Sequence, residues 1–439
     1  MNSPMDRREF LKAGAVAGAG LAVAGSGFGQ TASAEDRPVR VGLIGPGRRG
    51  SGLLGLLLSL KGVQVPAVCD VDPAQAKAAQ DMVERAGQPR PEGYTGDELA
   101  YRKLLAREDL DAVVIATPWE WHAPMAVESM KAGKYTAVEV PCAITMEQCW
   151  ELVNTHEATG VPCMMLENWS FRQDNLAVLN MIRQGLFGEI VHCHCAHSHN
   201  CIDHWYWDQQ GNPRWPAKYL ETYNRDQYPM HSLGPVLSWM DIPCGDMFDY
   251  ATATATASRG INAHFARLLG PDHPRAKKEY PQGDIVTTVV RTHKGRTIVI
   301  NNDMQLPRPY DNRWLIQGTL GLYDEVRESV YIHGKSPKVN TWEPFKPYQE
   351  KYDHAWYRQF RKEAASASHA GTDYLELALF VQAVRNRTQT PIDVYESVLM
   401  SVIIPLSEQS IARGSAPVKC PDFTRGKWKT RKPTFAVEA

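Results

Sequence analysis

The sequence has no excess of charge of either sign. Its 48 Lys and Arg residues nearly balance 49 Asp and Glu residues, which leaves a formal net charge of −1 at pH 7, and no basic tract dominates. Proteins that bind nucleic acid or anionic membrane surfaces usually carry a strong basic patch. After the N-terminal segment, no apolar run approaches the length of a membrane span. We therefore expect neither a nucleic-acid partner nor a membrane span.

The cysteines lack any tandem spacing. There are nine, an odd number, and Cys193, Cys195 and Cys201 share one stretch with several histidines. Zinc is one interpretation of this stretch. The alternation HCHCAHSH at 192–199 is instead typical of a β-strand, which sends successive side chains to opposite faces, so only every second residue can converge. The sequence therefore predicts no metal site.

The N-terminal residues have the features of an export signal. The twin-arginine stretch DRREFLK at 6–12 precedes an Ala-, Gly- and Val-rich run at 13–27 and a small-residue cleavage pattern at 32–34. An N-terminal membrane helix is the alternative, but this run is short and glycine-rich for a span. Twin-arginine export carries folded proteins, so a tightly held cofactor would be bound beforehand. We expect a signal peptide over 1–34, the twin-arginine export machinery as a partner, and a periplasmic or secreted protein.

After the signal, strand and helix patterns alternate. We expect strands at 39–44, 63–69, 112–117, 135–140 and 161–167, and helices at 53–60, 73–86, 125–132 and 146–159. Such alternation favours a doubly wound parallel sheet. The sequence therefore predicts an α/β fold with an N-terminal Rossmann domain over residues 35–167.

The pattern changes after residue 168. A helix at 175–184 is followed by longer strands at 190–199, 247–258, 284–293 and 296–304, and by further strands at 315–323 and 330–333. Helices are expected at 374–387 and 394–412. Strands joined by short turns favour antiparallel pairing. We therefore expect residues 168–439 to form an α+β substrate and catalytic domain with a mostly antiparallel open sheet.

A glycine motif lies between the first predicted strand and helix. Gly45, Gly47 and Gly50 would let the backbone approach a pyrophosphate, whose charge the helix N-terminus stabilises. Asp70, at the end of the next strand, would accept hydrogen bonds from the adenosine ribose, which favours NAD over NADP. Arg48 or Arg49 could meet a phosphate. The sequence predicts a bound NAD.

A loop rich in aromatic residues follows the third predicted strand. Ligands of open parallel sheets bind beyond the carboxyl ends of the strands. Trp119, Glu120, Trp121 and His122 are therefore placed to flank the nicotinamide ribose, with a share for His122 in fixing the turn. A packed aromatic loop without a binding role is the alternative.

Several motifs together resemble a known family. The glycine loop, ATP at 116–118 with WEWH at 119–122, and the glutamate-x-proline motif at 139–141 are similar to the Gfo/Idh/MocA oxidoreductases. That family joins a Rossmann domain to an α+β domain whose open sheet forms a sugar site, often with paired subunits, so a homodimer is an expectation. Its ordinary dehydrogenases have a lysine at the middle position of glutamate-x-proline, where this chain has Val140.

One branch, glycoside hydrolase family 109, is more similar still. The shared motifs are EVP at 139–141, WEWH at 119–122, ENW at 167–169, YPMH at 228–231 followed by LGP, and RPY at 308–310. Members are chiefly α-N-acetylgalactosaminidases that use NAD without net consumption. The resemblance implies a retaining glycosidase that oxidises the sugar transiently at C3, removes the C2 proton, eliminates the C1 group and adds water.

The resemblance also implies roles for individual residues. His231 and Tyr228 would be catalytic, as base and proton carrier. Further cofactor contacts would come from Glu139, Val140, Asn168 and Tyr228. Substrate contacts would come from His197, His199, Trp215, Tyr228, Pro229, Met230, His231 and Tyr310. At His197 the branch has a tyrosine, and at Pro216 an arginine, so the sugar could differ from N-acetylgalactosamine.

Two other functions share these features. A periplasmic NAD(P)-dependent sugar oxidoreductase would have the same leader and fold, although Val140 argues against it. A sugar-binding protein that holds NAD without catalysis is the second alternative, which the changes at His197 and Pro216 would favour. Oxidation of free sugars would indicate the first, and bound NAD without turnover the second.

Overall fold

The structure is a computed structural model that describes residues 37–364 and 371–437. The predicted signal peptide, residues 1–34, lies outside them. Within the described ranges, no helix combines the length and the apolar character that crossing a bilayer requires.

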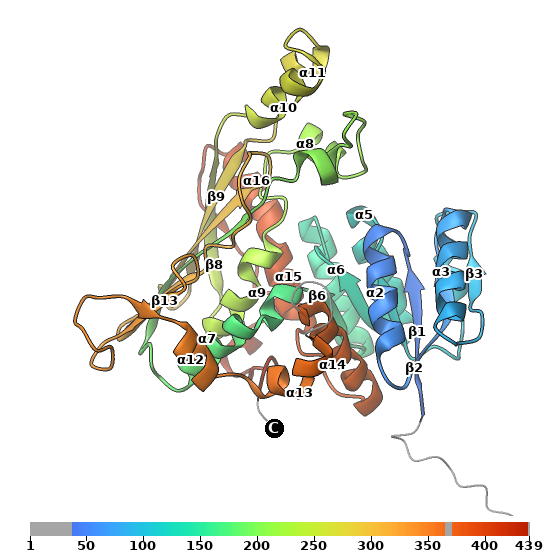
Figure 1. Ribbon diagram of the computed structural model, residues 1–439, viewed down its shortest axis with the longest axis horizontal. Helices are drawn as coiled ribbons and strands as arrows, with labels where there is room; N and C mark the ends of the chain where they lie inside the picture. Colours follow the sequence, from blue (N-terminus) through green and yellow to red (C-terminus); the bar gives the residue numbers. More distant parts are fainter. Residues whose placement is uncertain (1–36, 365–370, 438–439) are drawn as a thin grey trace, which may run out of the picture. The chain divides into compact units, whose positions relative to one another are not determined.

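The N-terminal part of the described chain forms a six-stranded sheet in which all paired neighbours are parallel (Figure 1). The strand order is β3-β2-β1-β4-β5-β6. The strands are β1 (Val39–Ile44), β2 (Val63–Cys69), β3 (Glu92–Tyr94), β4 (Ala112–Ile115), β5 (Tyr135–Glu139) and β6 (Cys163–Leu166). The connecting helices are α2 (Arg48–Ser59), α3 (Pro73–Arg85), α4 (Tyr101–Leu105), α5 (Trp119–Lys131) and α6 (Met146–Thr159). This arrangement confirms the predicted doubly wound fold, with its switch point between β1 and β4.

Local sequence signals explain several of these boundaries. Asp72 caps α3 by accepting a hydrogen bond from the backbone N–H of Ala74, and Pro73 occupies the first helical position. Thr145 caps α6, which ends at Gly160 in the left-handed conformation (φ 70°). These caps satisfy backbone groups that the helix ends leave without partners.

The helix predicted at 125–132 begins earlier than expected. In the structure α5 starts at Trp119, so Trp119 to His122 form its first turn rather than a loop. Pro124 lies inside the helix. A proline at this sixth position has no N–H for the carbonyl of Glu120, so the helix tolerates the loss of one backbone hydrogen bond there.

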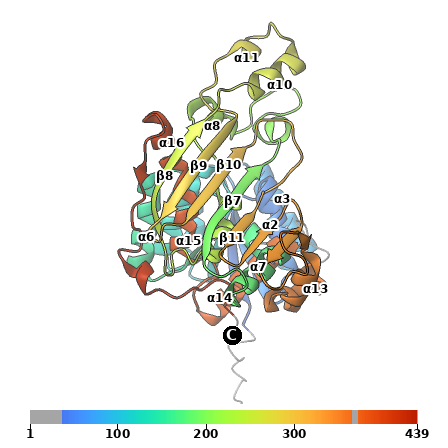
Figure 2. The ribbon, with the colours of Figure 1, turned by 90° about the vertical axis from the view of Figure 1, so that its left-hand side faces the viewer.

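The C-terminal part contains a nine-stranded sheet in the order β14-β13-β12-β11-β7-β10-β9-β8-β15. The strands are β7 (Ile190–Ser198), β8 (Phe248–Ala255), β9 (Ile285–Thr292), β10 (Thr297–Asp303), β11 (Leu315–Gly318), β12 (Gly321–Asp324), β13 (Ser329–Ile332), β14 (Glu343–Pro344) and β15 (Val418–Lys419). Strands β7 and β10 pair in parallel, and the other pairs are antiparallel. Figure 2 shows β8, β9, β10 and β7 side by side. The predicted mostly antiparallel sheet is confirmed.

Two predicted elements are each divided in the structure. The strand expected at 315–323 is the antiparallel pair β11 and β12, because a tight turn follows Gly318, where a Cβ would lie 2.2 Å from the carbonyl oxygen of Phe187. The helix expected at 394–412 is α15 (Val394–Ser401) followed by α16 (Ile403–Ala412). Pro405 cannot donate to the carbonyl of Ser401, which interrupts the helix there.

The other helices cover the second sheet or connect its strands. They are α7 (Gln173–Arg183), α8 (Ala217–Thr222), α9 (Met230–Trp239), α10 (Gly260–Leu269), α11 (Pro274–Lys277), α12 (Lys346–Lys351), α13 (Ala355–Ala364) and α14 (Thr372–Asn386), with short helices η1 (Asn168–Phe171), η2 (Ile202–Tyr206, a π-helix) and η4 (Lys427–Lys429). Helix α9 packs on β7, whereas α14 packs on α2, β1 and η1. The chain after residue 371 therefore returns to the Rossmann sheet and contributes to its edge of the site.

Candidate active site

The glycine loop between β1 and α2 has the shape that a pyrophosphate requires. Gly45 has a φ of +84°, and a Cβ there would lie 2.7 Å from the carbonyl oxygen of Ala116. A Cβ at Gly50 would lie 2.0 Å from the carbonyl oxygen of Gly45, whereas nothing lies within 4 Å of the Cβ position of Gly47. Gly47 also precedes α2 without a side-chain cap. The first N–H groups of α2 are therefore available to a phosphate.

Asp70 follows β2 at the same edge of the sheet. One carboxylate oxygen accepts a 2.9 Å hydrogen bond from the backbone N–H of Asp72. Burial raises the pKa of Asp70, although backbone hydrogen bonds oppose this shift. The carboxylate retains acceptor capacity for ribose hydroxyl groups, as an NAD site requires.

Arg49 is the centre of an ion-paired network. Its Nε lies 2.5 Å from Oε1 of Glu139, and its Nη1 lies 2.6 Å from Oδ2 of Asp373. Burial would lower the pKa of Arg49, but the two carboxylates overcome this effect and raise it. Arg48, which is exposed, donates instead to the carbonyl oxygen of His204 at 3.3 Å. The guanidinium of Arg49 is thus committed to carboxylates rather than free for a phosphate.

Asn168 extends this network from η1. Its Nδ2 donates to Oδ1 of Asp373 at 2.7 Å. Its Oδ1 is buried and has no hydrogen-bond partner among the described residues. A buried acceptor without a donor is costly, and a bound cofactor that donates there would satisfy it. Together with the open position at Gly47, this orphaned oxygen fits a dinucleotide.

His122 connects two segments at the edge of the Rossmann sheet. Its Nδ1 lies 2.8 Å from the carbonyl oxygen of Pro141, and its Nε2 lies 2.6 Å from that of Thr117. Burial lowers the pKa of His122, so the neutral ring donates to one carbonyl at a time. The side chain therefore holds the segment around Val140, which is itself buried, against the end of β4.

The other residues of this helical turn face the second domain. Trp119 stacks with Tyr228, with ring centroids 5.8 Å apart, and contacts Trp215 edge-on at 5.5 Å. Glu120 accepts a 2.6 Å hydrogen bond from the Tyr219 hydroxyl and pairs with Lys218. Trp121 is partly buried and packs against the main hydrophobic core. Trp119 and Glu120 therefore join the end of β4 to residues of the second domain.

His231 lies in the first turn of α9 and is held by a buried carboxylate. Its Nδ1 lies 2.8 Å from Oε1 of Glu167, whose side chain is fully buried. Glu167 also accepts from the backbone N–H groups of Trp169 and Ser170, at 3.1 and 2.9 Å. When Nδ1 donates to the carboxylate, Nε2 is left as the basic nitrogen. The pair therefore presents one oriented ring nitrogen, Nε2, that is free to accept a proton.

A glycine makes room for this pair. A Cβ at Gly234, one turn after His231 on α9, would lie 1.8 Å from Oε2 of Glu167. Any other residue there would displace the carboxylate. The LGP motif after YPMH thus has a direct steric reason: its glycine lets the helix that carries His231 approach the carboxylate that orients the imidazole.

The histidine and tyrosine rings next to His231 form an uncharged wall. The ring centroids of Tyr228 and His197 lie 5.1 and 5.4 Å from that of His231. Burial lowers the pKa of His197 well below its usual range, and His231 and His199 lower it further. Burial, reinforced by Glu139, raises the pKa of Tyr228 well above its ordinary value. Both side chains are therefore neutral near pH 7.

The remaining predicted substrate residues are divided between the wall and its surroundings. The Tyr310 ring lies 5.6 Å from His197 and 5.0 Å from His199. Trp215 is 40% exposed at the edge of the site. Met230 is buried in the hydrophobic core, and Pro229 is the buried residue that precedes α9. These last two can offer a ligand little beyond their backbone.

Sequence reasoning missed three acidic residues of this site. Glu167 was noticed only as part of the ENW motif, and Asp373 and Glu376 were not noticed at all. Glu376 is fully buried, and neither carboxyl oxygen has a hydrogen-bond partner among the described residues. Glu167 directly follows β6 and begins the ENW motif, and this position could have indicated a site residue. No local signal marks the other two, because Arg49 and Asp373 are 324 residues apart.

Comparison with protein-family models divides the chain into three matched segments. Residues 4–24 match the twin-arginine translocation pathway signal sequence, which indicates export to the periplasm or beyond. Residues 39–167 match the oxidoreductase family with an NAD-binding Rossmann fold. Residues 171–430 match the C-terminal domain of glycosyl hydrolase 109. These matches support an NAD-type cofactor in an exported protein.

Solved structures share the fold at low sequence identity. An NAD-binding oxidoreductase from Klebsiella pneumoniae superposes with a TM-score of 0.69 at 19% identity, covering 89% of this chain and all of the other. Levoglucosan dehydrogenase in complex with NADH and levoglucosan has a TM-score of 0.66 at 18% identity, covering 88% of this chain and 100% of the other. At such identities the likeness establishes the fold alone.

Curated relatives match at higher identity and over their full length. A glycosyl hydrolase family 109 protein from Stenotrophomonas maltophilia is 40% identical, with 99% of each chain covered. An alpha-N-acetylgalactosaminidase from Tannerella forsythia is 38% identical, with 98% of this chain and 99% of the other covered. The match of the second domain to the family model and the full-length relatives lead to one conclusion: the chain belongs to glycosyl hydrolase family 109.

Proposed function

We propose that this exported protein is a retaining glycosidase that uses NAD without net oxidation or reduction. Its substrate is a glycoside of the N-acetylgalactosamine type or a related sugar. The observation that carries the proposal is the pair of Glu167 and His231, in which a buried carboxylate orients the imidazole, and Glu167 directly precedes Asn168, which belongs to the Arg49 network. The alpha-N-acetylgalactosaminidase from Tannerella forsythia supports the class of sugar.

The acids of the site argue against direct hydrolysis. The usual route needs two carboxyl groups on opposite sides of the scissile bond, one as acid and one as base or nucleophile. Glu139 and Asp373 are paired with Arg49, and Glu167 is buried and bonded to backbone N–H groups. None of these three is a free carboxylate facing a sugar.

The chain's own residues would hold the cofactor at the edge of the first sheet. Gly45, Gly47 and Gly50 admit the pyrophosphate, Asp70 accepts from the adenosine ribose, and Asn168 offers its unsatisfied oxygen. When bound, NAD supplies a reversible acceptor for the hydride on the sugar C3. A C3 ketone makes the C2 proton acidic enough for a side-chain base to remove.

His231 is the base in this proposal. Its Nε2 accepts the C2 proton, the electron pair of the C2–H bond forms the C1–C2 double bond, and the bond from C1 to the leaving oxygen breaks. Water then adds at C1, and its second proton goes to the leaving oxygen. His231, whose Nε2 proton exchanges with solvent before it is returned, protonates C2. Glu167 stabilises the charged imidazole between these steps, as carboxylates do in other acid–base pairs.

Tyr228 would handle the proton of the sugar hydroxyl. Its raised pKa keeps the phenol protonated, so it takes the hydroxyl proton only as it passes its own proton to solvent, and it donates a hydrogen bond to the C3 oxygen once that oxygen is a ketone. It lies between the stacked ring of Trp119 and the rings of His197 and His231. His197, His199, Trp215 and Tyr310 complete the proposed sugar wall. In the proposed arrangement the signal spans 1–34, the Rossmann domain 35–167 and the catalytic domain 168–439.

A panel of nitrophenyl α- and β-glycosides in deuterated water tests the proposal. The protein is purified without added cofactor, and both nitrophenol release and deuterium at C2 are measured. We expect cleavage of an N-acetylgalactosaminide with deuterium entering at C2. Cleavage without C2 exchange in product or in recovered substrate would contradict the elimination route. Oxidation of free sugars without cleavage would instead favour the sugar oxidoreductase.

Val140 offers a second test of the same chemistry. The valine is buried beside the Glu139 network, where ordinary dehydrogenases of the wider family have a lysine. We expect Val140→Lys to lower glycoside cleavage, because a buried ammonium disturbs the network and adds a competing proton donor. Higher turnover of the same glycoside by this variant would contradict our explanation of the missing lysine. Val140→Ile, which stays apolar, is the control.

A further inference from the structure

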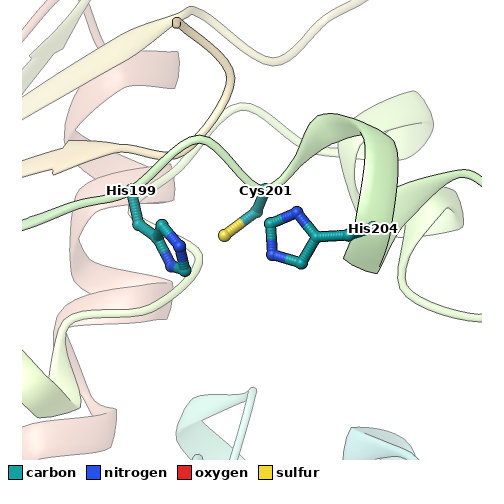
Figure 3. Close-up of side chains that lie close together, drawn as sticks. All are labelled: His199, Cys201 and His204. Atoms are coloured by element: carbon teal, nitrogen blue, oxygen red, sulfur yellow. The ribbon is translucent and has the colours of Figure 1, made fainter. Parts of the chain in front are cut away.

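Three potential metal ligands come together where β7 ends. His199, Cys201 and His204 each offer one ligand atom, and these atoms lie within 4.8 Å of one another. Figure 3 shows the Cys201 sulfur between the two imidazole rings, whose centroids are 5.3 Å apart. The prediction that no metal binds rested on strand alternation through residue 199. The strand ends at Ser198, so that alternation does not apply to Cys201 and His204.

The backbone explains why these side chains converge. The N–H groups of His199 and Cys201 donate to the carbonyls of Asp303 and Met304, at 2.8 and 3.0 Å, which continues the edge of β10. Helix η2 begins directly after Cys201 and brings His204 back toward the sulfur. A small core that includes Ile202, Tyr206, Trp207 and Phe265 anchors this segment. The arrangement is therefore built by packing rather than left to a free loop.

The ligand atoms are not committed to other partners. Within the described chain, no hydrogen bond involves the imidazole of His199 or the thiol of Cys201, and the one polar contact of the His204 imidazole is from Nδ1 to Asp203 at 3.4 Å, which leaves Nε2 free. By contrast, His192 and His194 on the same strand are hydrogen-bonded to Thr297 and Asn301, at 2.9 and 2.8 Å. Each of the three converging residues therefore keeps a ligand atom without a partner.

We propose that His199, Cys201 and His204 bind one transition-metal ion, zinc in particular, with a fourth position that takes an oxygen ligand. Two imidazoles and a thiolate form a donor set that binds zinc in preference to magnesium or calcium. Cys201 is 3% exposed, whereas the His204 side chain is 43% exposed, so a fourth ligand reaches the ion from the His204 side.

The position of this ion gives the fourth ligand its chemistry. The His199 ring contacts Tyr310 at 5.0 Å and His197 at 6.2 Å, both on the proposed sugar wall. Water occupies the fourth position in the free protein, and a hydroxyl of the glycoside or its aglycone replaces it on binding. This last step rests on the proposed function, whereas metal binding itself does not.

Metal content and cobalt spectroscopy test the site without any measurement of turnover. The full-length mature protein is stripped with a chelator, reloaded with Zn²⁺ or Co²⁺, and analysed for bound metal. We expect about one tightly bound ion per chain and, with Co²⁺, the visible bands and thiolate charge-transfer absorption of a four-coordinate site. Cys201→Ser and His204→Gln should weaken Zn²⁺ binding at least about tenfold and abolish or shift these bands. Cys244→Ser and His192→Gln are the matched controls, and circular dichroism verifies that every variant folds.

The outcomes separate this inference from the proposed function. A wild-type protein that retains no Zn²⁺ and gives no Co²⁺ bands would overturn the metal site, whatever its activity. Binding that survives in both Cys201→Ser and His204→Gln would overturn it as well, since the metal would then lie elsewhere. A protein that binds Zn²⁺ through these residues but cleaves no glycoside would retain the site and refute the glycosidase.

Discussion

The two sides of the candidate site differ in the charges that their side chains carry. On the Rossmann side, Arg49 is paired with Glu139 and Asp373, and Asn168 bonds to the same aspartate. On the side of the second sheet, His197 and Tyr228 are both neutral because burial disfavours their charged forms. The first side has fixed charges, one guanidinium held between two carboxylates. The second has groups that can each take or give one proton.

This difference indicates that the two sides have different roles. Fixed ion pairs in a partly buried site hold geometry, since their charges do not change during a reaction. A neutral wall around His231 leaves the proton taken from a substrate with one stabilising partner, Glu167, which is fully buried. We therefore expect substitutions on the first side to lower stability and cofactor retention. Substitutions on the second side should lower turnover.

The largest effect is expected from His231→Ala. Because the imidazole is the proposed base, its loss should lower the rate of glycoside cleavage about 10³-fold, with bound NAD and the melting temperature nearly unchanged. Nitrophenol release measures the rate of cleavage, and the absorbance of released cofactor measures the bound NAD. His333→Ala, which changes an exposed histidine beyond β13, is the control. Full activity of His231→Ala would show that His231 is not the base and that the second side does not carry the proton transfer.

Glu167→Gln should have a smaller effect on the same side. The amide can still accept from Nδ1 of His231, but its NH₂ group would then face the N–H of Ser170, a donor opposite a donor. We expect kcat to fall about 10- to 100-fold with little change in KM, because the imidazolium formed during turnover loses its counter-charge. An unchanged kcat with lowered stability would show that Glu167 has only a structural role.

Arg49→Met tests the opposite side. The change leaves Glu139 and Asp373 as neighbouring carboxylates without a cation. Because the Arg49 side chain is 33% exposed, solvent screening reduces the cost, and we expect a loss of about 2 kcal/mol in the free energy of unfolding. The protein should also retain less NAD on purification. Arg48→Met, which alters an exposed side chain, should change the free energy of unfolding by less than about 0.5 kcal/mol. Equal losses in both variants would contradict the network.

How far the sequence predicts this molecule depends on the distance between interacting residues. The glycine motif, Asp70 and the alternating strands and helices are local patterns, and the fold that they predict is confirmed by the parallel sheet and its order. Tyr228 and His231 are three positions apart, a spacing that brings side chains together at a helix start, and their rings lie 5.1 Å apart. Their chemical roles remain predictions.

The rest of the site depends on packing that no local pattern encodes. Asp373 reaches Arg49 because α14 packs on α2, and nothing near either residue reveals this contact. Glu167 meets His231 because Gly234 leaves space for its carboxylate, which is a property of two elements together. The same limit explains the metal ligands, since a period-2 pattern holds only where the strand continues.

Glu376→Met is expected to have the smallest effect, with the opposite sign. Burial raises the pKa of Glu376 well above its ordinary value, and the nearby Asp373 and Glu139 raise it further. The folded state therefore favours the protonated carboxyl. The stability contributed by this protonation is complete below the unfolded pKa, near 4.5, and is lost as the pH rises toward the folded value. A methionine does not titrate and has no buried oxygen that needs a donor. The variant should therefore gain about 1 kcal/mol in the free energy of unfolding at pH 8, and less at pH 5. Urea unfolding at the two pH values measures the difference. A variant less stable than the wild type at pH 8 would mean that the carboxylate is held by a partner, and the cofactor side would then contain one more fixed charge beside Arg49, Glu139 and Asp373.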